Sequence, residues 1–245
     1  MSKWSLWISS GISRSNLRFL GKKYECFDRM DLVKNLILEI ISFLENNLET
    51  IPEIELLKSI KNVSLRKDNF VSQMPNFPPK ERALSDAISS IESSELLGIK
   101  ESLERVIGDL RWNIDDGDFY EKDSEIGESY LLGNMNCELI GPTLGAFRSN
   151  GLRLGLFLLE ENIFYKDHKH KAAELYLNLT NGTQWRFGDL IWENKQAGSI
   201  VFNKPYDIHA MKVGSKPFLS IWCWPTSSGE KCILVPQTDW GKIKE

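Results

Sequence analysis

The sequence has no strong charge of one sign, no long apolar run and no clustered cysteine. Its formal net charge is −4 over 245 residues, so it offers no broadly basic surface for nucleic acid. No apolar run approaches the roughly 18–20 residues that cross a bilayer, so no membrane partner is expected. Neither a P-loop nor a dinucleotide-binding glycine pattern occurs. With 42% hydrophobic and 26% charged residues, the chain is predicted to be soluble and globular.

Cysteine usage and the N-terminus bear on the compartment. Cys26, Cys137, Cys223 and Cys232 are scattered without a CxxC pair, which is typical of reduced thiols rather than of a disulfide framework. No acidic residue precedes Glu25, but the N-terminus has neither the unbroken apolar region nor the cleavage site of a secretory signal. We expect a cytoplasmic protein with an uncleaved N-terminal arm. An organelle transit peptide is the alternative.

The first half of the chain has helical periodicity. A first helix is predicted over residues 31–48, with Asp31 as its N-cap. Its apolar residues recur at intervals of three and four: Leu32, Leu36, Ile40, Phe43, Leu44 and Leu48. Pro52 suits the first turn of a second helix, over residues 52–63. A third helix is predicted over residues 81–107, with an interruption at Gly98, after a proline-rich loop.

The pattern changes after about Trp112 to short β-prone segments between turns. The sequence TNGT at residues 180–183 is a strong hairpin signal. Strands are predicted over residues 152–159, 173–179, 184–187, 198–202, 208–213, 218–224 and 231–236. Many short, evenly spaced strands indicate a sandwich or barrel. We therefore expect a helical segment, residues 1–110, followed by a β-barrel domain, residues 111–245.

Histidine is rare, and its placement suggests a metal site. Two of only three histidines, His168 and His170, are two residues apart, so on a strand both leave the same face. On a continuous strand Glu174 and Tyr176 would share that face, although a turn within residues 169–173 would reset the register. Imidazoles with one carboxylate suit a divalent transition metal, and His209 on another strand would complete the set. The alternative is an ordinary polar strand face.

These residues form a pattern that resembles a known family. The spacing Tyr165-x-x-His168-x-His170-x-x-x-Glu174-x-Tyr176, followed by His-Ala-Met at residues 209–211, resembles the cupin-type dimethylsulfoniopropionate (DMSP) lyases over roughly residues 110–228. The HxHxxxE part, with Gly182 after it, is similar to the first motif that all cupins share. The two tyrosines and the His-Ala-Met tripeptide are the more specific part. The resemblance implies a mainly β fold, a cupin double-stranded β-helix (jelly-roll barrel), after the helical segment.

The resemblance also implies an activity. The family cleaves DMSP, a small zwitterion, to dimethyl sulfide and acrylate by β-elimination. It implies Tyr176 as the base and Tyr165 as its partner at the substrate or metal, with these two roles open to exchange. One divalent ion, which could be iron, manganese, zinc, nickel or cobalt, would be held by the three histidines and Glu174.

Further residues are candidates for substrate binding. Aromatic faces are suited to a sulfonium, which has no hydrogen to donate. The aromatic candidates are Trp185, Phe187, Trp222 and Trp224. Lys212 stands where relatives usually have arginine, and it keeps the charge without the planar fork that grips a carboxylate.

Other functions share parts of this pattern. Another metal-dependent cupin enzyme, such as a dioxygenase or an isomerase, would have the metal ligands without needing the tyrosine pair. A non-catalytic cupin that binds a small ligand is the third hypothesis. A Ser-His-Asp hydrolase is disfavoured, because metal binding would leave no histidine to act as base. The helices are expected either to pack over one end of the barrel or to form a homodimer contact.

Overall fold

The computed structural model describes residues 29–71, 74–226 and 229–243. The expectations for the N-terminal arm, the transit peptide and Cys26 lie outside these residues. Cys137, Cys223 and Cys232 are free and buried. In the part of the chain that is described, no helix combines the length and apolarity needed to cross a membrane.

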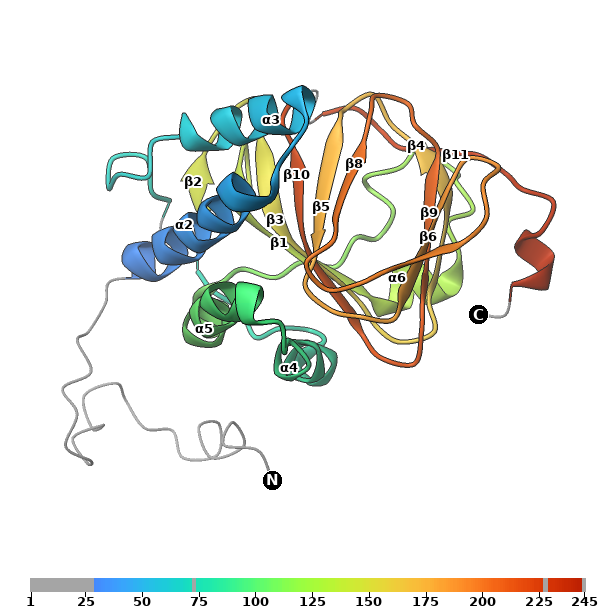
Figure 1. Cartoon of the computed structure of the whole chain (residues 1–245), viewed down its shortest axis with the longest axis horizontal. Helices are drawn as coiled ribbons and strands as arrows, with labels where there is room; N and C mark the ends of the chain where they lie inside the picture. Colours follow the sequence, from blue (N-terminus) through green and yellow to red (C-terminus); the bar gives the residue numbers. More distant parts are fainter. Residues whose placement is uncertain (1–28, 72–73, 227–228, 244–245) are drawn as a thin grey trace.

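The C-terminal half of the chain forms two facing β-sheets (Figure 1). One sheet has the strand order β2-β1-β3-β10-β5-β8 and the other has the order β11-β4-β9-β6-β7. The strands are β1 (Asn134–Gly141), β2 (Phe147–Arg148), β3 (Arg153–Leu159), β4 (Phe164–Lys169), β5 (Glu174–Asn178), β6 (Thr183–Phe187), β7 (Glu193–Lys195), β8 (Ile200–Asn203), β9 (His209–Val213), β10 (Phe218–Trp224) and β11 (Ile233–Leu234). From β3 to β11 the chain passes repeatedly from one sheet to the other, which is the winding of a jelly-roll barrel.

Within the described residues, four longer helices precede the barrel: α2 (Arg29–Asn47), α3 (Ile51–Lys61), α4 (Glu81–Ser89) and α5 (Leu97–Val106). Pro52 lies in the first turn of α3, as predicted, and the Glu53 carboxylate accepts the Thr50 backbone N–H at 2.9 Å in a capping box. Helix α2 begins at Arg29, so Asp31 lies in its first turn rather than at the N-cap.

The predicted third helix is wrong in one respect. The helix is interrupted at residues 90–93, between α4 and the 3₁₀ turn η2 (Ser94–Leu96), and not at Gly98, which lies inside α5. The Ser90 hydroxyl donates to the Ala87 backbone carbonyl at 2.7 Å, the kind of local bond by which serine favours helix ends over helix interiors. Two further 3₁₀ turns, η3 (Ile107–Asp109) and η4 (Trp240–Lys242), and helix α6 (Glu128–Gly133) complete the described elements.

The predicted strands located most of the barrel but did not include β1, β2, β4 or β7, and the segment 231–236 pairs only over two residues. Strand β1 is the largest omission. It is buried at every position, and its sequence, NMNCELIG, mixes polar and apolar residues without clear alternation. Its asparagines make side-chain and bridge contacts with the segment before α6, so a polar sequence could still occupy the interior.

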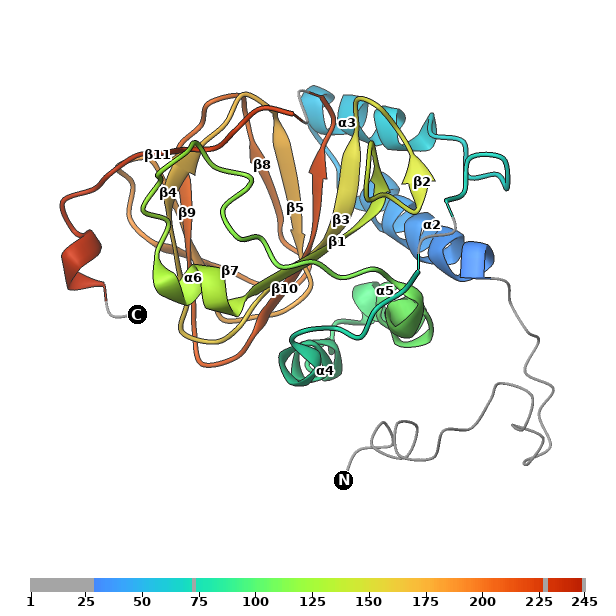
Figure 2. The same cartoon turned by 180° about the vertical axis from the view of Figure 1, so that it is seen from behind.

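The helices pack on the outer face of the six-stranded sheet (Figure 2). Leu156 on β3 and Ile221 on β10 point to this side and share one apolar cluster with Leu36 and Ile40 of α2. Alternate residues on the same strands, such as Phe157, point into the barrel and belong to a second cluster. The helical segment thus covers a sheet face rather than an end of the barrel, and a homodimer through it stays a prediction.

Candidate metal centre and active-site cavity

The histidines meet because β4 and β9 are antiparallel neighbours. His168 and His209 are direct partners in this pair, and His170 follows β4 by one residue. The register shifts between Tyr165 and His168. Residues three apart on a regular strand face opposite sides, and this irregularity lets both side chains contact the interior of the barrel.

Glu174 reaches the same place from the other sheet. The chain turns after His170, and Glu174 begins β5 in the facing sheet. Of the two alternatives that the sequence left open, the continuous strand from His168 to Tyr176 is wrong and the turn within residues 169–173 is correct. Glu174 and Tyr176 alternate correctly on β5, so both point into the barrel.

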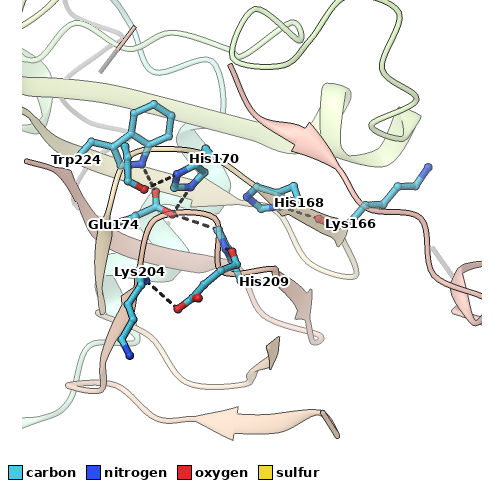
Figure 3. Close-up of polar contacts among 9 residues, drawn as sticks. Lys166, His168, His170, Glu174, Lys204, His209 and Trp224 are labelled. Atoms are coloured by element: carbon cyan, nitrogen blue, oxygen red, sulfur yellow. Dashed lines mark hydrogen bonds and ion pairs between the residues drawn. The ribbon is translucent and has the colours of Figure 1, made fainter. Parts of the chain in front are cut away.

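Each histidine ring is anchored by its Nδ1 atom (Figure 3). The partners are backbone carbonyls two residues away: Lys166 for His168 at 2.8 Å, Ala172 for His170 at 2.9 Å, and Asp207 for His209 at 3.0 Å. A carbonyl only accepts, so each Nδ1 must carry the hydrogen. In the neutral ring Nε2 is then the free electron-pair donor, which is the arrangement of a histidine ready to bind a metal.

The Nε2 nitrogens of two of these histidines face a carboxylate oxygen. Glu174 Oε2 lies 3.1 Å from His170 Nε2 and 3.3 Å from His209 Nε2. His209 Nε2 is buried and has no hydrogen bond. Electron pairs of neutral rings and of a carboxylate repel one another unless a proton or a metal ion lies between them, and a proton accounts for the His170 contact. One potential ligand atom from each of the three histidines lies within 4.8 Å of the others. This donor set fits a divalent transition ion.

Burial and mutual attraction also shift the pKa values here. Burial and the neighbouring histidines lower the pKa of His168 well below its usual value, so this ring is neutral. Burial alone would raise the pKa of Glu174, but attraction to His170 outweighs it and holds that pKa well below its usual range. Burial likewise opposes a charge on His170, and attraction to Glu174 nevertheless raises its pKa. Glu174 is therefore ionised and attracts positive charge, which the His170 imidazolium can supply and which a divalent ion would supply in its place.

A cavity of about 50 Å³ opens beside these ligands. Four of the residues predicted at the site line it together with His168, His170 and Glu174: Tyr165, Tyr176, Trp222 and Trp224. Sequence reasoning missed the rest of the lining: Asp115, Phe119, Tyr130, Asn136, Phe157 and Cys232. Asp115, Phe119 and Tyr130 belong to the segment between η3 and β1, which has no strand periodicity to place it at the barrel interior.

Three predicted substrate-binding residues do not line the cavity. Trp185 is fully buried behind Tyr176, with ring centroids 5.1 Å apart. Phe187 stacks on Trp185 at 6.2 Å. The Lys212 ammonium lies 3.9 Å from the ring centroid of Trp192, because Lys212 alternates with the inward residues of β9 and points away from the barrel interior. Lys212 therefore does not reach the cavity, and its expected contact with a substrate carboxylate is wrong.

Phe119, Trp222 and Trp224 form an aromatic box on one side of the cavity. Their ring centroids lie 5.9–6.5 Å apart, and each pair is close to perpendicular, at 79–87°. Perpendicular rings expose both faces and edges to a small guest, and the faces attract cations. The Arg153 guanidinium lies over Phe119 at 5.4 Å and is itself paired with Glu138 at 2.6 Å.

The two candidate catalytic tyrosines have different surroundings. Tyr165 stacks face to face on Tyr130, with centroids 4.6 Å apart and planes at 8°. The Tyr130 hydroxyl donates to Asp115 Oδ2 at 2.8 Å, which fixes the stacked pair. Tyr176 packs between Phe157 and Trp185. Burial raises the pKa of both Tyr165 and Tyr176.

Comparison with known proteins agrees with this geometry. A family model described as dimethylsulfoniopropionate lyase matches residues 54–220, which extends the resemblance into the helical segment. Among curated proteins no sequence matches the chain. A chain from the crystal structures of the DMSP lyases RdDddP and RnDddQII is 17% identical, with a TM-score of 0.64 over 85% of this chain and 100% of that one.

Two more solved structures resemble this chain, one over most of its length and one over less than half of it. The DMSP lyase DddQ from Ruegeria pomeroyi DSS-3 is 17% identical, with a TM-score of 0.61 over 84% of this chain and 96% of that one. A cupin-like protein from Thermotoga maritima is 11% identical, with a TM-score of 0.38 over 46% of this chain and 85% of that one. The mainly β cupin fold with a preceding helical segment is confirmed.

Proposed function

Because this chain belongs to the dimethylsulfoniopropionate lyase family, and is thereby a carbon–sulfur lyase, we propose that it cleaves DMSP to dimethyl sulfide and acrylate by β-elimination. One observation carries the proposal: a single buried cavity brings Tyr165 and Tyr176 together with His168, His170 and Glu174. That set supplies a base, a metal site and an aromatic surface within reach of one small molecule.

The proposed ion is held by His168, His170 and His209, with Glu174 as the fourth ligand. Its identity is iron, manganese, zinc, nickel or cobalt, since nitrogen and oxygen ligands of this kind suit each of them. When bound, a divalent ion supplies the positive charge that offsets the substrate carboxylate and the negative charge developing beside it. The buried, unpaired Nε2 of His209 supports this assignment.

Tyr176 is the proposed base. It lies two residues after Glu174 on the inward face of β5 and lines the cavity. A bound divalent ion would oppose the burial that raises the pKa of Tyr176. The phenolate oxygen would then take the proton from the carbon next to the substrate carboxylate. The electron pair of that C–H bond forms the double bond of acrylate, while the C–S bond breaks and its electrons leave with neutral dimethyl sulfide. Tyr165, held by its stack on Tyr130, would orient the substrate.

The sulfonium end is proposed to lie in the aromatic box of Phe119, Trp222 and Trp224. A sulfonium offers positive charge without a hydrogen-bond donor, so ring faces are its natural partners. Three aromatic side chains in mutual contact would also help to exclude water from this end of the substrate. At about 50 Å³ the cavity has room for a few water molecules, so the lining must move apart to admit the substrate.

The test is turnover by the purified, metal-analysed full chain. Supplied with DMSP, it should release dimethyl sulfide, measured in the headspace by gas chromatography. Tyr176→Phe removes the acidic oxygen alone and should lower kcat by about 10²–10⁴-fold, the usual contribution of a positioned base. Metal content and the unfolding midpoint should not change.

Tyr165→Phe is the matched control, since it removes the other cavity phenol and should lower kcat less. A larger loss in Tyr165→Phe would exchange the two roles. Near-normal turnover by Tyr176→Phe would show that Tyr176 is not the base. A metal-loaded wild-type protein that releases no dimethyl sulfide would reject the proposed reaction in favour of a dioxygenase, an isomerase or a ligand-binding cupin.

A further inference from the structure

Trp224 makes a hydrogen bond that a role in substrate binding does not explain. Its indole Nε1–H donates to Glu174 Oε1 at 2.6 Å, and both side chains are buried. The pairing of β10 with β5, in which Cys223 lies opposite Leu175, brings the two residues together. Figure 3 shows the indole and two imidazoles converging on the same carboxylate.

The two oxygens of Glu174 consequently have different partners. Oε1 accepts the indole N–H, whereas Oε2 lies 3.1 Å from His170 Nε2 and 3.3 Å from His209 Nε2. A free carboxylate turns easily about its last torsion, and its two oxygens are then equivalent. A short hydrogen bond to a charged group is strong enough to remove that freedom in a buried site.

We propose that Trp224 is a positioning residue for the metal centre. Its indole holds Oε1 of Glu174, so that Oε2 alone is presented to an ion among the three histidines. The Trp224 ring also packs on His170, with centroids 4.7 Å apart, and so restrains a second ligand. This inference rests on the metal site of the proposed function and concerns how tightly and in what geometry that site binds its ion.

The chain supplies a matched control two residues away. Trp222 lies on the same strand, lines the same cavity and donates its indole N–H to the backbone carbonyl of Leu156 at 3.3 Å. Neither partner in that bond is a proposed metal ligand. Trp222→Phe and Trp224→Phe therefore make the same chemical change in one cavity, and only the second deletes a bond to a ligand.

The experiment measures Zn²⁺ affinity by competition with a chelator, using full-length protein stripped of metal and no DMSP. Trp224→Phe should weaken Zn²⁺ binding by about 10–100-fold, the usual effect of losing an outer-shell partner of a ligand. Trp222→Phe should leave the Zn²⁺ affinity within about threefold of wild type. With Co²⁺ in place of Zn²⁺, the visible absorption of Trp224→Phe should change, and that of Trp222→Phe should match wild type.

A double-mutant cycle separates positioning from general stability. In a Glu174→Ala background Trp224→Phe should cause no further loss of Zn²⁺ affinity, because phenylalanine keeps an aromatic ring beside His170 and the change removes only the bond to the carboxylate. Equal losses in both backgrounds would overturn the inference, as would an unchanged affinity in the single variant or a wild-type protein that binds no Zn²⁺. If Trp224→Phe does not fold, ¹⁵N-indole spectra of the wild type serve instead.

Those spectra should show one far-downfield indole N–H that shifts when Zn²⁺ is added, and the absence of such a resonance would overturn the inference. The test of Trp224 positioning can succeed or fail independently of the test of the lyase reaction. Tight Zn²⁺ binding that depends on Trp224, in a protein inert toward DMSP, would support positioning and reject the lyase reaction. Release of dimethyl sulfide by a protein whose Zn²⁺ affinity does not depend on Trp224 would support the lyase reaction and reject positioning.

Discussion

The imidazole rings of the centre are oriented by local backbone before any ion arrives. Each Nδ1 is bonded to a carbonyl only two residues away, so ring orientation depends on the turn or strand that carries the histidine. His209 lacks any further hydrogen bond on its Nε2 atom. A buried acceptor without a partner costs free energy, and an ion binding there recovers it.

His209→Ala should therefore sharply reduce metal binding. The change removes one of three nitrogen ligands, and the affinity should fall by more than the roughly 10–100-fold cost of losing an outer-shell contact. The check is metal content per chain after gel filtration, by elemental analysis. Lys212→Met on the same strand is the control, because that side chain points away from the centre and lies over Trp192. Unchanged metal content in His209→Ala would remove it from the ligand set.

At this scale the sequence predicted the residues of the motif better than their neighbours. The three histidines, Glu174 and the tyrosine pair follow fixed spacings that a reader can recognise. Phe119 lies in irregular chain before β1, and no periodicity indicates which way its side chain points. Its place in the aromatic box depends on a tertiary contact with Trp222 and Trp224, which local sequence does not encode.

Among the elements, β4 depends on contacts on both of its faces. Its inward side carries His168, while Asp167 on the outward side is fully buried under Arg186 and Trp240. Arg186 of β6 donates from Nε to Asp167 Oδ1 at 3.0 Å and from Nη2 to Oδ2 at 2.5 Å. Trp240 of η4 adds a third donor to Oδ2 at 2.7 Å. The C-terminal segment and β6 thus fix the histidine-bearing strand together.

Arg186→Leu should lower the free energy of unfolding by about 3–5 kcal/mol, because it leaves the buried Asp167 carboxylate without its charge partner. The measurement is urea denaturation followed by tryptophan fluorescence. Lys195→Met breaks the surface pair with Glu193 in the adjoining hairpin and should cost less than about 1 kcal/mol. Adding Asp167→Leu to Arg186→Leu should recover part of the loss. If Arg186→Leu and Lys195→Met lower the free energy of unfolding by the same amount, the buried pair does not support β4.

Element prediction was most accurate where periodicity was strong. Residues 31–48 and the strands around β3, β9 and β10 follow one clear period each, and the structure places an element at each of these segments. Two kinds of error remain. The break between α4 and α5 begins where the Ser90 hydroxyl bonds the Ala87 carbonyl, and a search for apolar spacing overlooks such a local contact. Strand β1 is polar in sequence yet buried, because its polar groups find partners in the segment before α6.

For the molecule as a whole, the six-stranded sheet separates two apolar clusters. Leu156 and Ile221 face the helices, and Phe157 and Trp222 on the same strands face the cavity. The cavity wall is therefore supported from behind by α2 and its neighbours. The division at residue 110 stays a prediction, but the two parts share one continuous apolar cluster. Sequence periodicity detected the two parts and could not show how they pack.

This shared cluster predicts that the helices and the barrel unfold together. Leu36 on α2 is fully buried against the sheet, so Leu36→Ala should lower the free energy of unfolding by about 2–5 kcal/mol. The loss should be the same whether unfolding is followed by helical circular dichroism or by tryptophan fluorescence, which reports mainly on the barrel. Leu38→Ala, on the same helix with 44% of the side chain exposed, should change it by no more than about 0.5 kcal/mol. An independent helical segment would behave differently: Leu36→Ala would shift the helical signal to lower urea and leave the fluorescence transition in place, because the barrel would then hold its cavity without support from α2.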